Sequence, residues 1–319
     1  MASLVIDARA INGTTYEHDG GVIASIFLSL VAFILTCIIN GLAQSGPNKL
    51  FRKNTAQISD ENPTEFTPAG PTFSLWGLIY MWQLIWIIYA IVCIWRKTDV
   101  GYLYLHPFTL HYSVFILFIV NMLLNSTWLI LWDRLKFGIG TLVIFAMFFT
   151  IVAATIIVHV LLWNYRSDYR NLGFTTDIWL IRFLVINGLA LYATWLLIAA
   201  NLNLAIWIKP KLSLRIEGWA TTICLTIVLL GVISYWVLEN FVFYCSMAYT
   251  WSPWLVLYVA LAGIIAKHHT LLKEGSRNQI YVLIILILTT VFFIVKIVLF
   301  VVRYTKSEIP TGSHPAWDL

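Results

Sequence analysis

One uninterrupted apolar run spans Ile139–Trp163 and reads IGTLVIFAMFFTIVAATIIVHVLLW. It contains no Asp, Glu, Lys or Arg, and it exceeds the roughly 20 residues that a helix needs to cross the hydrocarbon core of a bilayer. A strand of a membrane barrel would instead alternate apolar and polar residues over about ten positions. The run therefore predicts a transmembrane helix.

Comparable apolar runs occur on both sides of this one. The eight predicted spans are, in chain order, Val22–Leu42, Phe73–Trp95, Leu110–Trp132, Ile139–Trp163, Trp179–Ile208, Trp219–Leu238, Phe241–Ala266 and Ile280–Val302. In the seventh, Ser252 and Pro253 interrupt the run, so its apolar core begins near Trp251. The predicted fold is an all-α membrane protein with eight transmembrane helices, and the predicted location is an integral, multi-pass one in a membrane that the sequence does not specify.

The composition excludes several other classes of protein. Sixty per cent of the 319 residues are hydrophobic and only 11% are charged, whereas a soluble domain has about 25% charged residues. This excludes a soluble enzyme, a nucleic-acid-binding module, a disordered chain and a small disulfide scaffold. The lipid bilayer is the partner that the composition predicts. The cysteines lie singly in apolar runs and predict buried thiols, with neither a disulfide nor a metal site; they are Cys37, Cys93, Cys224 and Cys245.

The chain divides at its polar segments. We expect a polar tail over residues 1–20, a five-helix bundle over 21–208, a basic linker over 209–217, three additional helices over 218–303 and a second polar tail over 304–319. The loops after the odd-numbered spans hold 11 Lys and Arg, and the other loops with both tails hold 7. Because cytoplasmic loops carry the excess of positive charge, both termini are expected outside the cytosol. A glycosylation sequon at Asn12 lies on that side.

Amides and aromatics recur at helical spacing in three of the predicted spans. The sets are Trp76, Tyr80 and Gln83 in the second span, Asn121, Asn125, Trp128 and Trp132 in the third, and Tyr192, Trp195, Ala199 and Asn203 in the fifth. The offsets within each set place its members on one helix face. Aromatic walls with a few hydrogen-bonding amides suit a flat, largely apolar ligand. Each of these sets forms one stripe along its helix, and each stripe alone is also compatible with interhelical packing and with anchoring of Trp at the membrane interface.

Three motifs in these spans resemble those of one family, the translocator proteins, also called tryptophan-rich sensory proteins. They are PAGPTFSLWGLIY at 68–80, LNSTW at 124–128, and YATW at 192–195 followed by Ala199, Leu202-Asn203 and Trp207. The resemblance covers residues 21–208 and implies a five-helix bundle around a pocket near the loop after helix one, with tetrapyrroles, sterols or synthetic aromatic compounds as ligands. The last three spans look like those of longer, eight-helix relatives. Leu204 stands where the family's proposed sterol motif has Tyr.

Four ionisable positions inside or beside the spans have alternative interpretations. Lys296 is either a transport or ligand group, or a side chain that extends toward the membrane surface beside Arg303. Arg182 is expected to anchor the fifth helix at the interface, and His159 to pack between helices. The adjacent pair His268-His269 has no ligand set around it in sequence, so no metal site is expected.

No catalytic motif is found, which predicts that the protein is not an enzyme. The leading functional hypothesis is binding of a flat lipophilic ligand, tetrapyrrole- or sterol-like, for sensing or transport. The eleven residues of the three stripes would form the site, a tetrapyrrole would be a ligand, and no covalent cofactor is expected. The alternatives are a transporter or channel for a small polar solute or ion, in which Lys296 takes part, and a receptor or assembly subunit. The sequence leaves open whether a second copy of the chain is a partner in a homodimer.

Overall fold

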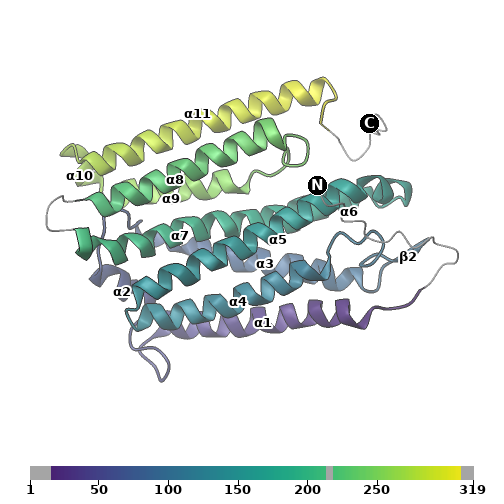
Figure 1. Ribbon diagram of the computed structural model, residues 1–319, viewed down its shortest axis with the longest axis horizontal. Coiled ribbons are helices and arrows are strands. Elements are labelled where there is room, and N and C mark those ends of the chain that lie inside the picture. The colour runs from purple at the N-terminus through teal and green to yellow at the C-terminus, as the bar shows by residue number, and fades with distance from the viewer. Residues whose placement is uncertain (1–15, 213–217, 310–319) are drawn as a thin grey trace.

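The computed structural model describes residues 16–212 and 218–309. Long helices lie side by side along the long axis of the molecule, and two thin layers flank a middle one (Figure 1). In the view of Figure 1, α1 and α4 lie at one side, α5 and α7 in the middle, and α8, α9 and α11 at the other side. Residues 1–15, 213–217 and 310–319 lie outside the described residues. They include the Asn12 sequon and parts of the predicted tails and linker.

The first five spans form a bundle. Their helices are α1 (Gly20–Ser45), α3 (Leu75–Cys93), α4 (Tyr112–Asp133), α5 (Phe137–Asn171) and a continuous segment made of α6 (Thr175–Leu180), the π-helical η2 (Ile181–Ile186) and α7 (Asn187–Leu212). The most extensive packing is of α5 against α7 and α4, followed by α1 against α4. Most of the α6–α7 segment is buried, so it is the central helix of the molecule.

Short elements connect these helices. The loop after α1 contains α2 (Thr55–Glu61) and the 3-10 helix η1 (Gly70–Ser74). After α3, the strands β1 (Lys97–Thr98) and β2 (Gly101–Tyr102) pair antiparallel.

The last three spans pack directly on the bundle. They comprise α8 (Trp219–Val237) with the π-helical η3 (Leu238–Val242), α9 (Ser252–Lys267) with the short α10 (His269–Lys273), and α11 (Arg277–Thr305). Both α8 and α9 pack against α7, and α11 packs against α8 and α9. One continuous hydrophobic core extends through both parts, from Trp86 in α3 to Trp254 in α9.

Seven helical segments are long and apolar enough to cross a membrane within the described part of the chain. The eighth, α9, has 16 residues and rises only about 24 Å, which is less than the roughly 30 Å hydrocarbon core. Only the second half of the predicted seventh span, Phe241–Ala266, is α9, because residues 243–251 form turns and irregular structure. The expected start of its apolar core near Trp251 is confirmed. Pro253 occupies the first turn of α9, where the missing N–H costs no helical hydrogen bond.

Large apolar side chains point away from the bundle on most spans. Leu142, Phe149 and Leu123 are each more than 60% exposed, a pattern that suits contact with lipid tails and not with water. Together with the span lengths, this identifies an integral, multi-pass membrane protein.

Candidate functional site

A cavity of about 600 Å³ lies at one end of the five-helix bundle. Ligand sites usually have volumes of roughly 300–1,000 Å³ and mostly apolar walls. Residues from α1, α2, η1, α3, α4, α7 and the last residue of α9 line this cavity. It therefore lies beneath the loop that follows α1.

Two sets of contacts hold α2 over the cavity. Asn54 caps α2 through a reciprocal pair of hydrogen bonds with Gln57, which satisfies two backbone N–H groups that would otherwise be free. Just before the helix, the backbone N–H groups of Arg52 and Lys53 donate to the buried carboxylate of Asp133, at 2.7 and 3.1 Å. Trp132 donates its indole N–H to the Thr55 carbonyl. The end of α4 thus fixes the position of α2.

Aromatic rings from α3 and α7 form one wall. The rings of Trp76 and Tyr80 stack with centroids 5.6 Å apart, and Trp195 meets Trp76 edge-on at 6.0 Å. Phe73 meets Trp195 edge-on from the other side. Such edge-to-face contacts are favourable because the positive ring edge faces the negative ring face. Ala199, one turn after Trp195, leaves space beside this wall.

Trp128 and Trp132 from α4 form a second part of the lining, with ring centroids 5.6 Å apart. The indole N–H of Trp128 donates to Asn203 Oδ1 at 3.1 Å. The Asn203 amide in turn donates to the Thr141 hydroxyl and to the Phe137 carbonyl, at 2.7 and 2.8 Å. Asn203 therefore fixes the orientation of Trp128 from behind the wall.

A buried polar network supports Tyr80 in the same way. The Asn125 amide donates to the hydroxyls of Tyr80 and Tyr192 at 3.3 and 3.2 Å, and its oxygen accepts from Asn40 at 3.0 Å. The Tyr192 hydroxyl donates to Asn121 Oδ1 at 2.8 Å. Buried polar groups that are fully paired make a core rigid and unique, so this network orients the ring of Tyr80.

The eleven predicted site residues fall into two groups. Trp76, Tyr80, Trp128, Trp132, Trp195 and Ala199 line the cavity. Gln83, Asn121, Asn125, Tyr192 and Asn203 lie among buried groups outside its lining. We expected these amides to bond a ligand directly, but their polar groups bond protein partners; Gln83, for example, donates to the Gly188 carbonyl and accepts from Trp86. Whether any of the eleven residues binds a ligand stays a prediction.

Sequence reasoning missed several polar lining residues. Asn40 and Gln44 come from α1, Ser59 and Asp60 from α2, and Lys267 from the end of α9. The nitrogen of Lys267 lies 3.6 Å from an Asp60 carboxylate oxygen. No motif brings these segments together, because more than 200 residues separate Asp60 and Lys267.

Lys296 is buried and paired, which contradicts the alternative in which its side chain extends toward the membrane surface. The alternative of a transport or ligand group stays a prediction. Its ammonium group forms an ion pair with Glu239 and donates to the Thr250 carbonyl at 2.6 Å. Glu239 also accepts from the indole N–H of Trp254 and from the Tyr235 hydroxyl. Glu239 was missed because it lies between two predicted spans, whereas η3 keeps it inside the helical segment and 2% exposed.

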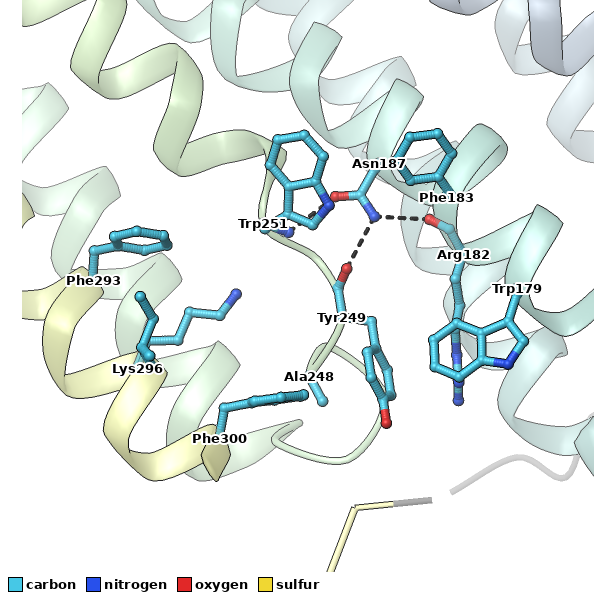
Figure 2. A pocket seen from close by; sticks show the side chains of 11 residues that line it. Trp179, Arg182, Phe183, Asn187, Ala248, Tyr249, Trp251, Phe293, Lys296 and Phe300 are labelled. Atoms are coloured by element: carbon cyan, nitrogen blue, oxygen red, sulfur yellow. Dashed lines mark hydrogen bonds between the residues drawn. The ribbon is translucent and has the colours of Figure 1, made fainter. Parts of the chain in front are cut away.

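A second cavity of about 300 Å³ lies beside Lys296, between the start of the fifth span and α11. Figure 2 shows its aromatic walls and the amide of Asn187, which donates to the carbonyls of Arg182 and Tyr249. The guanidinium carbon of Arg182 lies 4.8 Å from the Trp179 ring centroid and 4.4 Å from that of Tyr249. Arg182 is only 8% exposed, and its predicted role as an interfacial anchor stays a prediction.

The histidines take part in local packing. His159 lies 3.5 Å from the Thr250 hydroxyl. His268 lies 3.2 Å from the Thr67 carbonyl, and burial lowers the pKa of its imidazole. His269 faces the Ala266 carbonyl instead. Among residues 16–212 and 218–309, no three His, Cys, Asp or Glu side chains lie close enough together to hold a metal ion.

Comparison with known proteins supports the resemblance seen in the motifs. The comparisons find no curated protein and no solved structure that matches the chain significantly. A family model described as TSPO-like protein matches residues 26–302, which includes the bundle and all three additional helices. This all-α, multi-pass membrane protein therefore belongs to the TSPO-like protein family.

Proposed function

We propose that the protein binds a flat, largely apolar ligand of the tetrapyrrole or sterol class in the aromatic cavity, and that it senses or transports this ligand without changing it chemically. The main observation in support is the cavity of about 600 Å³, which is lined by four tryptophans from three helices: Trp76, Trp128, Trp132 and Trp195. Flat aromatic walls offer a large contact area with little loss of side-chain freedom.

The polar groups around the cavity are consistent with such a ligand. The indole N–H of Trp195 has no hydrogen-bond partner within the described part of the chain, although buried indole N–H groups usually have one. A ligand with an acceptor atom near this ring would supply it. The cavity also reaches the protein surface, because the lining residues Gln44 and Asp60 are exposed. A ligand can therefore enter from the end of the bundle that carries α2.

Transport of a polar solute or ion along the amide stripes receives less support. The amides of Asn121, Asn125 and Asn203 bond protein groups, and the charge of Lys296 is compensated by Glu239. These groups build interhelical contacts and do not line the large cavity. The receptor or assembly role and the homodimer stay predictions from the sequence.

The test is a titration of the purified protein in detergent with protoporphyrin IX, followed by quenching of tryptophan fluorescence. Ala199→Phe adds a ring to the cavity wall, whereas Ala262→Phe adds the same ring at an exposed position of α9. We expect saturable quenching for the wild type and for Ala262→Phe, and a loss of at least tenfold in affinity for Ala199→Phe with an unchanged melting temperature.

Two results would contradict the proposal. If the wild type shows no saturable quenching with protoporphyrin IX or with a fluorescent sterol, the cavity does not bind this class of ligand. If Ala199→Phe binds as tightly as Ala262→Phe, the ligand lies elsewhere. Trp128→Phe and Trp195→Phe then identify the wall nearer the ligand, because the variant that removes the quenched indole loses the larger part of the signal.

A further inference from the structure

We infer that the mouth of the cavity recognises an acidic group on the ligand, and that the last three helices supply the cation that does so. The mouth consists of Ser59, Asp60 and Lys267. The ligand would then be an amphipathic anion, with a flat apolar body between the tryptophans and a carboxylate at the mouth. This inference rests on the proposed function and narrows its ligand class.

Lys267 is the first part of the argument. It is the only basic residue in the lining of the cavity among the described residues. It is also the last residue of α9, so it comes from outside the five-helix bundle. Its side chain is 30% exposed, and a partly desolvated ammonium group binds an anion more strongly than one in bulk water.

The position of Lys267 is fixed by contacts between α9 and the loop over the cavity. The backbone N–H of Ala69 donates to the Gly263 carbonyl at 2.9 Å. Gly263 lies so close to Thr72 that an added β carbon would be 2.1 Å from the threonine hydroxyl. Further along, Gln279 of α11 donates to the Glu65 carbonyl at 3.0 Å. The end of α9 is therefore held against the loop, and Lys267 stays at the mouth.

Ser59 provides a second, independent observation. Its side chain is 5% exposed and lines the cavity, and within the described part of the chain its hydroxyl has no hydrogen-bond partner. Burying a hydroxyl without a partner is unfavourable by roughly 1–3 kcal/mol. An oxygen of a bound carboxylate would accept a hydrogen bond from Ser59. The ammonium group of Lys267, which contacts the neighbouring Asp60, would balance the charge of that carboxylate.

The pair with Asp60 leaves Lys267 available. The two charged groups are 3.6 Å apart, which is longer than the roughly 2.7–2.9 Å of a charge-assisted hydrogen bond. The Asp60 side chain is 73% exposed, and exposed pairs of this kind contribute little. An ammonium group has three donors, so a ligand carboxylate can bond to Lys267 while Asp60 turns to water.

The test compares two probes that share the same flat ring system: protoporphyrin IX, which has two carboxylates, and its dimethyl ester, in which both are replaced by uncharged methyl esters. We expect Lys267→Met to weaken binding of the acid about tenfold and that of the ester less than twofold. Lys273→Met, at an exposed position of α10, is the matched control and leaves both affinities unchanged.

Two variants of α2 sharpen the test because they act in opposite directions. Ser59→Ala removes a hydroxyl that has no partner in the free protein, so we expect a stable protein that binds the acid about threefold more weakly. Asp60→Asn removes a negative charge from the mouth, so we expect it to bind the acid about threefold more tightly. Neither variant should change the affinity for the ester.

The outcomes separate this inference from the proposed function. If the wild type binds the acid and the ester equally and Lys267→Met changes neither affinity, the acidic group is not recognised at the mouth, and the proposed function stands. If Lys267→Met weakens both probes equally, Lys267 only holds α2 in place, which also overturns the inference. If neither probe binds the wild type, the proposed function itself fails for this class.

Discussion

Replacing Lys296 by Met should destabilise the protein strongly, because it leaves Glu239 buried without its cation. The two residues are 6% and 2% exposed, so little water can replace the lost charge. The same substitution also removes the donor to the Thr250 carbonyl. Met is close to Lys in length and is apolar, so the change tests the charge with little change in packing.

The remaining contacts of Glu239 set the magnitude. Removing one partner of a buried ion pair typically costs about 3–5 kcal/mol. Glu239 retains the donors Trp254 Nε1 at 3.0 Å and Tyr235 Oη at 3.2 Å, which offset part of this cost. We therefore expect a loss near the lower limit, about 3 kcal/mol in the free energy of unfolding.

The assay is reversible unfolding in mixed detergent micelles, followed by helical circular dichroism. Glu239→Gln and the double variant Lys296→Met/Glu239→Gln complete a double-mutant cycle. We expect the double variant to be more stable than Lys296→Met, because no buried charge is then left without a partner. Lys306→Met changes an exposed lysine just after α11 and serves as the control. A value for Lys296→Met within about 0.5 kcal/mol of the control would refute the reasoning.

Two further substitutions test the supports of the large cavity. Asn125→Leu should lower the free energy of unfolding by about 1–3 kcal/mol and also weaken protoporphyrin IX binding, because it removes the hydrogen-bond partner of the Tyr80 hydroxyl, whereas the Tyr192 hydroxyl keeps Asn121 and the Asn40 amide keeps the Thr36 carbonyl; weaker binding at unchanged stability in thermal unfolding would contradict its position behind the wall. Gly263→Ala should displace the loop over the cavity and so speed the alkylation of Cys37, a lining residue, measured in a Cys245→Ser background. Adding Thr72→Ala should reverse this effect, because it removes the two threonine atoms closest to the added β carbon. An unchanged alkylation rate would show that the loop does not depend on this contact.

Helix number could be predicted from the sequence because a bilayer sets a minimum length for an apolar run. The exception is the segment before Ser252, where the apolar residues of 243–251 are in turns and not in a helix. Hydropathy alone does not separate an apolar turn from an apolar helix. Pro253 is the signal that does so, since proline is favoured in the first turn of a helix, and it led to the expected start of the apolar core near Trp251.

The spacing of amides and aromatics predicted which helix faces meet, but not how deep each residue lies. Asn125 and Trp128 share one face of α4, and only Trp128 lines the cavity. The reason is chemical: an amide in an apolar interior is stable only when protein groups satisfy it, so it lies where other helices offer donors and acceptors. Aromatic rings have no such requirement on their faces and can border an open space.

The mouth could not be predicted, because it depends on contacts between distant parts of the chain. Ser59 and Lys267 are separated by more than 200 residues, and neither belongs to a periodic pattern. They lie at one cavity because α9 packs on α7 and on η1. Only the three-dimensional arrangement identifies Lys267 as a lining residue.

The three additional helices are an integral part of the fold that surrounds the cavity and not an appendage to the bundle. They share the hydrophobic core of the bundle, and the family model continues through them to residue 302. The hydrogen bond from Ala69 to Gly263 and the ion pair between Asp60 and Lys267 join them to the loop that covers the cavity. A five-helix bundle alone would lack these contacts. The last three helices therefore take part in covering the cavity and supply the basic residue of its lining, Lys267.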